Sequence, residues 1–164
     1  MKLTDEMKNA LMIIGAGGAV VHLTTCSADG KPNTVGERFV AVWKDEYILI
    51  ADMYAQKTRM NLMENPIGVI TIAHPVKGRT WAFRGPTTML QEGLPPDFEF
   101  HGAKAKDVLD EWGNWAEKEP PSEVPPDIRP PRLVQRGVMF MKVDEVYSYK
   151  ANEAGKKILW KGGK

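Results

Sequence analysis

Short apolar runs separated by turn-forming residues dominate the chain, and this pattern predicts a protein built mainly from β-strands. Six runs have the length and the boundaries of a strand. They cover residues 20–25, 33–42, 47–51, 67–73, 80–90 and 138–143. Between the first two runs lies Asp29-Gly30, a dipeptide that supplies the positive φ of a tight hairpin turn. Six short strands joined in this way, with few helices, favour a small antiparallel barrel.

The N-terminal stretch predicts a helix that ends in glycines. Thr4 can cap this helix, and its apolar face then carries Met7, Leu11 and Met12. The sequence GAGGAV over residues 15–20 contains part of the glycine pattern of a dinucleotide-binding fingerprint. That fingerprint follows a strand and opens a helix. Here a helix comes first and a strand follows, so we interpret the glycines as a helix stop.

Two further helices are expected. The first is short: it begins near Lys57, carries Met60 and Met63 at helical spacing, and stops at Asn65-Pro66. The second covers residues 101–117. Its apolar face is formed by Ala105, Val108, Leu109, Trp112 and Ala116.

Residues 92–132 form a distinct segment within a single domain. This segment joins the last of these helices to a proline-rich stretch around residues 120–131, which we expect to be extended and semi-rigid. A chain of 164 residues has the usual size of one domain, and it contains no internal repeat. We therefore expect one domain over residues 1–164, mainly β with α additions.

Two glycines interrupt predicted strands. Gly36 weakens the second strand, which indicates either a β-bulge or a close approach of another group to the backbone. Gly85 precedes Pro86 in the fifth strand. Because proline has no backbone N–H, it favours a sheet edge or a bulge at that point.

The charge balance and the cysteine count exclude several classes of site. The net charge is +1, from 22 basic and 21 acidic residues, and no basic block stands out. Binding to nucleic acid or to an anionic membrane surface is therefore not expected. Cys26 is the only cysteine and the three histidines are scattered, so neither an internal disulfide nor a metal site is expected. No apolar run has the ~20 residues needed to cross a bilayer. The N-terminus lacks a cleavable signal pattern, so we expect a cytoplasmic protein.

The residues between the third strand and the short helix predict an anion site. The apolar strand stops at Asp52, and the polar turn of residues 53–56 brings Lys57 and Thr58 to the first turn of the helix. Such a turn exposes free backbone N–H groups at the positive end of the helix dipole. Lysine adds a charge and threonine a hydrogen-bond donor, so the turn suits a phosphate. The alternative is a solvated lysine beside a capping hydroxyl.

These motifs, in this order, resemble the flavin-binding split-barrel family, which includes the pyridoxamine-phosphate oxidases and small FMN-binding proteins. Five stretches carry the resemblance. They are CSADGKPN (26–33), TVGERFVAVW (34–43), ADMYAQKTRMNLMENPIGVITI (51–72), WAFRGPTT (81–88) and RGVMFMKVDEVYSY (136–149). The most specific feature is the strand and turn followed by Lys-Thr, Asn and Asn-Pro at this spacing. The resemblance implies a six-stranded antiparallel split β-barrel with short helices, and it implies that the segment of residues 92–132 is an insertion.

The resemblance also implies a homodimer that binds FMN at the subunit interface. The phosphate would lie at the turn near Lys57, and the isoalloxazine ring would lie along the strands that contain residues 34–38 and 51–53. The cofactor-binding residues implied in this way are Thr34, Val35, Gly36, Glu37, Arg38, Ala51, Asp52, Met53, Gln56, Lys57 and Thr58. Alternation along the strand allows the side chain of only one of Glu37 and Arg38 to face the cofactor.

The expected chemistry is that of the flavin, with the protein supplying position, electrostatics and exclusion of water. We expect a flavin-dependent oxidoreductase that acts on a small substrate or a reduced nicotinamide. The alternatives are a non-catalytic flavin carrier or electron-transfer protein, and a reductase that uses a deazaflavin. No Ser-His-Asp set or carboxylate pair is evident, so no catalytic residue is assigned. The paired basic residues with which pyridoxamine-phosphate oxidases hold the substrate phosphate have no counterpart.

Some other side chains are expected to be structural. His22 is interpreted as a structural histidine within a strand, and Cys26 as a small buried hydrophobe. Four tryptophans lie outside the hairpin core and add aromatic surface that a two-fold interface would bury. They are Trp81, Trp112, Trp115 and Trp160.

Overall fold

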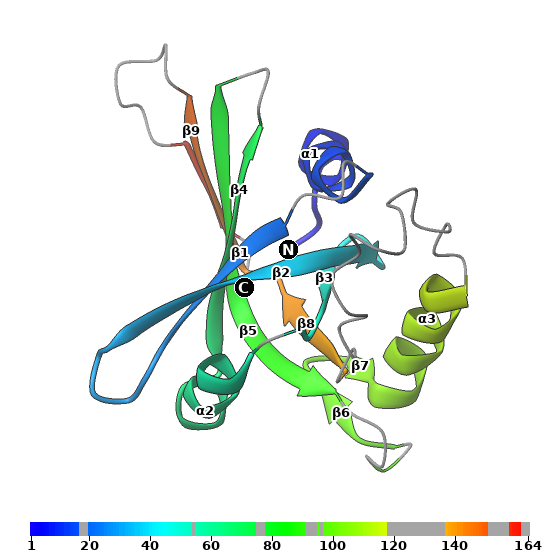
Figure 1. Ribbon diagram of the computed structural model, residues 1–164. Coiled ribbons are helices and arrows are strands. Elements are labelled where there is room, and N and C mark those ends of the chain that lie inside the picture. Colours follow the sequence, from blue (N-terminus) through cyan, green and yellow to red (C-terminus); the bar gives the residue numbers. More distant parts are fainter. Residues whose placement is uncertain are drawn as a thin grey trace, which may run out of the picture.

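The computed structural model describes residues 1–16, 20–53, 55–74, 78–90, 95, 97–117, 137–150 and 158–161. Strands form most of it (Figure 1). The helices are α1 (Asp5–Ala16), α2 (Gln56–Glu64) and α3 (Ala105–Glu117). The strands are β1 (Val20–Cys26), β2 (Pro32–Trp43), β3 (Tyr47–Ala51), β4 (Ile67–His74), β5 (Arg79–Leu90), β6 (Glu99–Phe100), β7 (Ala103–Lys104), β8 (Val138–Lys142), β9 (Glu145–Lys150) and β10 (Ile158–Lys161).

Six of the strands close into an antiparallel barrel, which confirms the fold expected from the sequence. Their order is β5-β4-β1-β2-β3-β8, and β8 pairs again with β5 to complete the ring. The hairpin of β9 and β10 extends the sheet beyond β5, while β6 and β7 form a separate small ribbon. In Figure 1, α1 lies near one end of the barrel and α2 near the other.

The barrel closes because β5 changes partners in its middle. Residues 79–84 of β5 pair with β9, and residues 87–90 pair with β8. Gly85 stands at the change, and a Cβ at this position would lie 1.8 Å from the carbonyl oxygen of Lys142. Pro86 follows, where the missing N–H removes a donor from the ladder. The irregularity predicted at Gly85-Pro86 is therefore confirmed as the corner of the barrel.

Inward-facing side chains from seven strands, β1 to β5, β8 and β9, form the main core. One complete row of cross-strand partners consists of Val146, Phe83, Ile70, Leu23 and Val35. Helix α1 adds Met7 and Leu11 to this core, both with no exposed area. The prediction that Met12 shares their face is wrong, because Met12 is 50% exposed. The buried face of α1 continues instead through Ala10 and Ile14.

A second core lies between the outside of β3 and β8 and helix α3. Tyr47 stacks on Phe140 with ring centroids 4.8 Å apart, and Val108 of α3 is fully buried in the same cluster. Helix α3 begins at Ala105, four residues later than predicted. His101 and Gly102 instead form the turn between β6 and β7, where both have positive φ. The proline-rich stretch around residues 120–131 lies outside the described residues.

Trp81 and Trp112 are the two of the four tryptophans whose burial the structure describes. Trp81 is 1% exposed and belongs to the barrel core, so it is not available to a subunit interface. Trp112 is partly buried against the second core. The side chains of Trp115 and Trp160 lie outside the described residues.

Replacing Gly85 by alanine is expected to lower the free energy of unfolding by about 3 kcal/mol, because the new methyl group would overlap the Lys142 carbonyl and force the corner apart. Gly113→Ala is the matched control, since a Cβ there meets nothing within 4 Å and Gly113 lies inside α3. Helix propensity predicts that this control is more stable by about 1 kcal/mol. Urea unfolding measures both, and equal stabilities would contradict the corner's role.

Candidate functional site

The structure brings the three predicted site stretches together. Arg38 of β2 pairs with Ala51 at the end of β3. The Glu37 carboxylate accepts the backbone N–H of Met53 at 2.9 Å, which ties β2 to the turn after β3. Asn33, at the start of β2, donates to the hydroxyl of Thr58 at 3.0 Å and so reaches the first turn of α2.

Alternation along β2 divides the predicted residues between two faces. Thr34, Gly36 and Arg38 lie on the outer face of the sheet, beside their cross-strand partners Thr24, His22 and Val20 of β1. Val35 and Glu37 point inward, and Glu37 has no exposed area. Arg38, and not Glu37, is therefore the charged side chain on the outer face.

The turn between β3 and α2 is ordered by a buried carboxylate. Asp52 is 1% exposed, and its Oδ1 accepts the backbone N–H of Ala55 at 3.1 Å. Its Oδ2 accepts from the guanidinium of Arg59 at 3.0 Å, and Arg59 is 38% exposed. The ion pair uses the charge of Arg59 within the turn, which leaves Lys57 as the exposed cation of the first turn of α2.

The first turn of α2 has the properties of an anion site. Ala55 is the N-cap residue and contributes no capping side chain, so the first backbone N–H groups lack that partner. Gln56 and Lys57 are exposed. Thr58 has no exposed area and its hydroxyl is bound by Asn33, which leaves its backbone N–H as its contribution to such a site. A cavity of about 190 Å³ opens here, lined by Asp52, Ala55, Gln56 and Arg59.

Gly36 lies in regular pairing with His22, so the bulge considered for this position is absent. The register shift of β2 comes later, between Phe39 and Ala41. A Cβ at Gly36 would lie 3.3 Å from the side chain of Val20, so the group that approaches this backbone within the chain is Val20.

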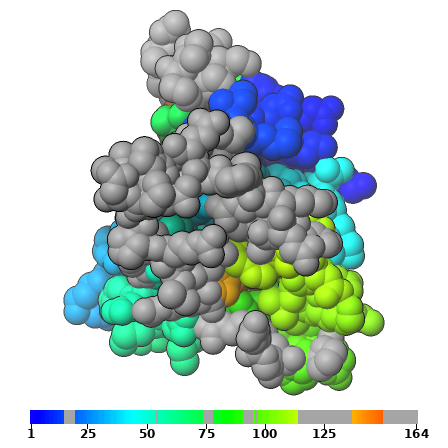
Figure 2. Space-filling model, turned by 45° about the vertical axis from the view of Figure 1, so that its right-hand side comes forward, coloured from blue at the N-terminus to red at the C-terminus, as the bar shows by residue number. Residues whose placement is uncertain are grey.

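Helix α2 rests on the β1–β2 hairpin through polar contacts that sequence reasoning missed. Asn61 is fully buried and donates to the Thr25 hydroxyl at 3.0 Å, and Asn65 donates to the carbonyl of Cys26 at 3.3 Å. Figure 2 shows the hairpin and α2 side by side. The signal was present, since asparagines four apart share one face of a helix. The methionines that were used to define this helix, Met60 and Met63, are 56% and 82% exposed.

The outer face of the sheet carries small side chains at most of its positions. One row across five strands consists of Tyr147, Ala82, Thr71, His22 and Gly36. The next row consists of Glu145, Arg84, Val69, Thr24 and Thr34. The solvated face of an antiparallel sheet is normally polar. Here the rows mix small, polar and charged side chains, and the apolar Val20 and the aromatic Tyr149 at the margin are 48% and 46% exposed.

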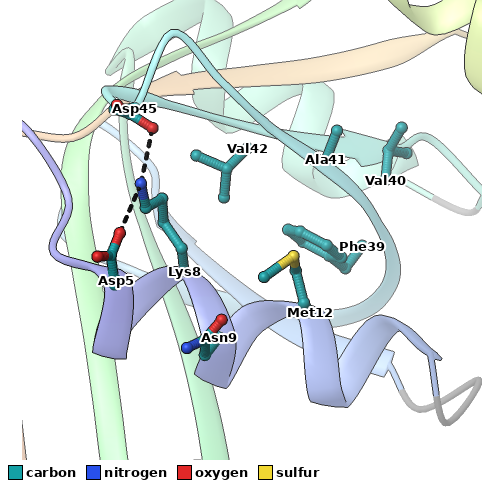
Figure 3. Close-up of a pocket in the computed structure, with 9 residues that line it drawn as sticks. All are labelled: Asp5, Lys8, Asn9, Met12, Phe39, Val40, Ala41, Val42 and Asp45. Atoms are coloured by element: carbon teal, nitrogen blue, oxygen red, sulfur yellow. Dashed lines mark hydrogen bonds and ion pairs between the residues drawn. The ribbon is translucent and has the colours of Figure 1, made fainter.

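A larger cavity, of about 650 Å³, lies between α1 and β2 (Figure 3). Lys8 projects into it and pairs with Asp5 at 3.0 Å and Asp45 at 2.9 Å. The hydrogen bonds to Asp45 and then Asp5 raise the pKa of Lys8 above its usual value. None of the residues predicted to bind the cofactor lines this cavity.

The described residues contain no group of three or more side chains placed to hold a metal ion. Among the described helices, none is both long and apolar enough to cross a membrane.

No family model matches the chain. It is 30% identical over 161 residues to the uncharacterized protein MJ0282 of Methanocaldococcus jannaschii, a match that covers 96% of this chain and 89% of that protein. Among solved structures, HupZ of Group A Streptococcus superposes with a TM-score of 0.63 at 17% identity, over 95% of this chain and 98% of HupZ. A pyridoxamine 5'-phosphate oxidase-related, FMN-binding protein of Nostoc punctiforme superposes with a TM-score of 0.57 at 11% identity, over 96% and 92%. The split-barrel fold inferred from the sequence is thereby confirmed.

Asp52→Ala is expected to lower the free energy of unfolding by about 2–3 kcal/mol, because it leaves the Ala55 N–H without its acceptor and Arg59 without its partner. The control is Asp110→Ala, which removes an exposed ion pair with Lys106 on α3 and should cost at most about 0.5 kcal/mol. Thermal or urea unfolding compares the two variants. Equal effects would mean that Asp52 does not order the turn.

Proposed function

The chain belongs to one family with the uncharacterized protein MJ0282 and has the split-barrel fold of pyridoxamine 5'-phosphate oxidase-related proteins, and on this basis we propose that it binds FMN. The sequence resemblance supports FMN as the ligand, and the positions of the predicted residues support where it would bind. The carrying observation is that residues 34–38, residues 51–53 and the first turn of α2 meet at one place.

The first turn of α2 fits the phosphate group. Its backbone N–H groups point toward the helix start, where the dipole favours an anion. Lys57 adds an exposed positive charge, while the carboxylate of Asp52 is already paired with Arg59. The adjoining cavity of about 190 Å³ is below the roughly 300–1,000 Å³ typical of pockets for drug-sized ligands. The phosphate end of FMN fits the cavity of one chain, and the isoalloxazine ring requires additional protein surface outside that cavity.

The outer face of the sheet fits the flavin ring. Gly36 has no side chain and its neighbours Thr34 and Thr24 have small ones, so the sheet is flat beside the predicted contact residues. A second copy of the chain would cover this face and complete the pocket. A homodimer with FMN at the interface is therefore part of the proposal, and two-fold symmetry is the commonest arrangement for such an assembly.

In this arrangement the bound flavin supplies the redox chemistry. The chain holds the cofactor at its two ends, through Lys57 and the α2 amides at the phosphate and through the outer edge of β2 at the ring. The buried carboxylates of Glu37 and Asp52 fix the backbone between these ends. The expected reaction is oxidation or reduction of a small substrate, or of a nicotinamide, beside the ring. No side chain is assigned a proton-transfer role.

Two alternatives use the same pocket. A flavin carrier or electron-transfer protein would bind FMN without turning over a substrate, and a deazaflavin-dependent reductase would retain a deazaflavin in place of FMN. Anaerobic addition of reduced nicotinamide to the FMN-loaded protein separates the first alternative from the enzyme, because bleaching of the flavin absorbance indicates hydride transfer. A binding comparison of FMN with a deazaflavin separates the second.

Lys57→Ala is expected to weaken the binding of FMN by about 10- to 100-fold and to leave the binding of riboflavin almost unchanged. A charged hydrogen bond to the phosphate contributes about 1.5–3 kcal/mol, and riboflavin has no phosphate. Fluorescence titration of the purified protein measures both ligands. Lys104→Ala, an exposed lysine on β7, is the control and should bind both as the wild type does. Equal losses for FMN and riboflavin would remove Lys57 from the phosphate site, and no retention of FMN by the wild type would refute the cofactor.

The wild type is expected to be a dimer at low micromolar concentration, and FMN should stabilise the dimer, because a ligand bound across an interface stabilises assembly by mass action. Ala82→Arg places a charged side chain in the middle of the outer face and should give a folded monomer with weak FMN binding. Ala28→Arg, at the exposed tip of the β1–β2 hairpin, should remain dimeric. Sedimentation velocity with and without FMN tests this. A wild type that is monomeric in both conditions would contradict the interface.

A further inference from the structure

His22 occupies the centre of the outer face of the sheet. It lies in the middle of β1, a strand with neighbours on both sides. Its cross-strand partner on β2 is Gly36 and its partner on β4 is Thr71. Along its own strand, the neighbours on the same face are Val20 and Thr24. The side chain of His22 is exposed, and its interpretation as a structural histidine stays a prediction.

The residues around His22 are smaller than the imidazole. Gly36 has no side chain, and Thr24 is joined to Thr34 by a hydroxyl–hydroxyl hydrogen bond at 2.9 Å. Direct cross-strand partners have Cβ atoms about 4.5–5.5 Å apart, so the imidazole stands beside the bare backbone of Gly36. No acceptor or donor in the described part of the chain is recorded for its ring. The two ring nitrogens of His22 are therefore accessible above a surface of smaller side chains.

The charged groups on this face lie at some remove from His22. On β2 the nearest is Arg38, whose cross-strand partner is Val20. On β5 it is Arg84, which pairs with Glu145 of β9 at 3.4 Å. The outward positions of β4 between Ile67 and Ala73 carry no charge. A neutral imidazole can act as both hydrogen-bond donor and acceptor, as the threonine hydroxyls around it also can.

We propose that His22 is a further cofactor-contacting residue, whose imidazole meets the flavin ring held along β2 and hydrogen-bonds to it. This inference rests on the proposed function, because the ring is placed there by the residues 34–38. Covering the outer face with a second subunit removes water from His22, and a buried polar group requires a partner. The heteroatoms of the flavin supply that partner beside β2.

The consequence is an effect on the reduction potential of the bound flavin. An imidazole N–H of His22 that donates to the flavin stabilises the electron-rich reduced flavin more than the oxidised flavin. Losing that donor should reduce the preference for reduced FMN by about tenfold, which for a two-electron couple is a fall in potential of about 30 mV.

The experiment compares the variants His22→Leu and His22→Gln in the FMN-loaded full-length protein. His22→Leu removes the hydrogen bond and should lower the potential and shift the visible absorbance bands. His22→Gln keeps a donor and should lie nearer the wild type. His101→Asn is the control, since His101 is exposed on the β6–β7 turn and asparagine tolerates its positive φ of 48°. Potentials of His22→Leu and His101→Asn that both equal the wild-type value would overturn the proposal.

A second measurement keeps the proposal testable if the His22 variants do not fold or do not retain FMN. Diethyl pyrocarbonate modifies accessible histidines, and mass spectrometry locates the modified residue. FMN should protect His22 of the wild type and leave His101 reactive, when the apo and loaded proteins are compared at the same oligomeric state. If the wild type retains FMN and His22 still reacts at its apo rate, this inference fails while the proposed function stands. If the wild type retains no FMN, both fail.

Discussion

Closure of the barrel at Gly85 is the constraint on which the other features of the molecule depend. The corner allows one strand, β5, to pair with β9 along its first half and with β8 along its second. Once the ring is closed, alternate side chains of each strand fill the interior, and the remaining ones form the outer face. The strand residues that a ligand can reach then lie on that face or at a strand end. The predicted site uses both positions: the outer edge of β2, and the end of β3 where the chain enters α2.

The entry to α2 is held by two buried carboxylates with different partners. Glu37 reaches from inside the barrel to the N–H of Met53, and Asp52 holds the N–H of Ala55 together with Arg59. Both groups act on the backbone, so they fix the direction in which α2 begins. Below, Asn61 and Asn65 attach the same helix to the β1–β2 hairpin. The first turn of α2 is thus fixed from both sides while its own amides and Lys57 face outward. That combination of rigid support and open donors is what a preorganised anion site requires.

Much of the fold could be predicted because apolar runs and turn residues are local signals. All six strands of the barrel, β1 to β5 and β8, were located to within one residue, and the Asp29-Gly30 hairpin followed from the dipeptide. Side-chain burial was less predictable. Met12 was assigned to the apolar face of α1, and Met60 and Met63 marked the helical spacing of α2, yet all three are exposed. Helix α2 buries Thr58 and Asn61 together with Leu62, and a hydrophobic period does not detect the two polar residues. Trp81 was counted as surface because its position inside the barrel depends on ring closure. Glu37 was predicted to bind the cofactor, and its bond to the Met53 backbone was missed because the two residues are 16 apart.

The central claim is that the first turn of α2 and the outer edge of β2 together hold FMN. The most direct test is a titration of the isotope-labelled wild type with FMN, followed through its backbone amide resonances by two-dimensional NMR. The account predicts that the largest shifts occur at Gln56, Lys57 and Thr58 and at residues 34–38, with α3 unaffected. Shifts confined to Lys8, Asn9 and Met12, beside the larger cavity between α1 and β2, would contradict it.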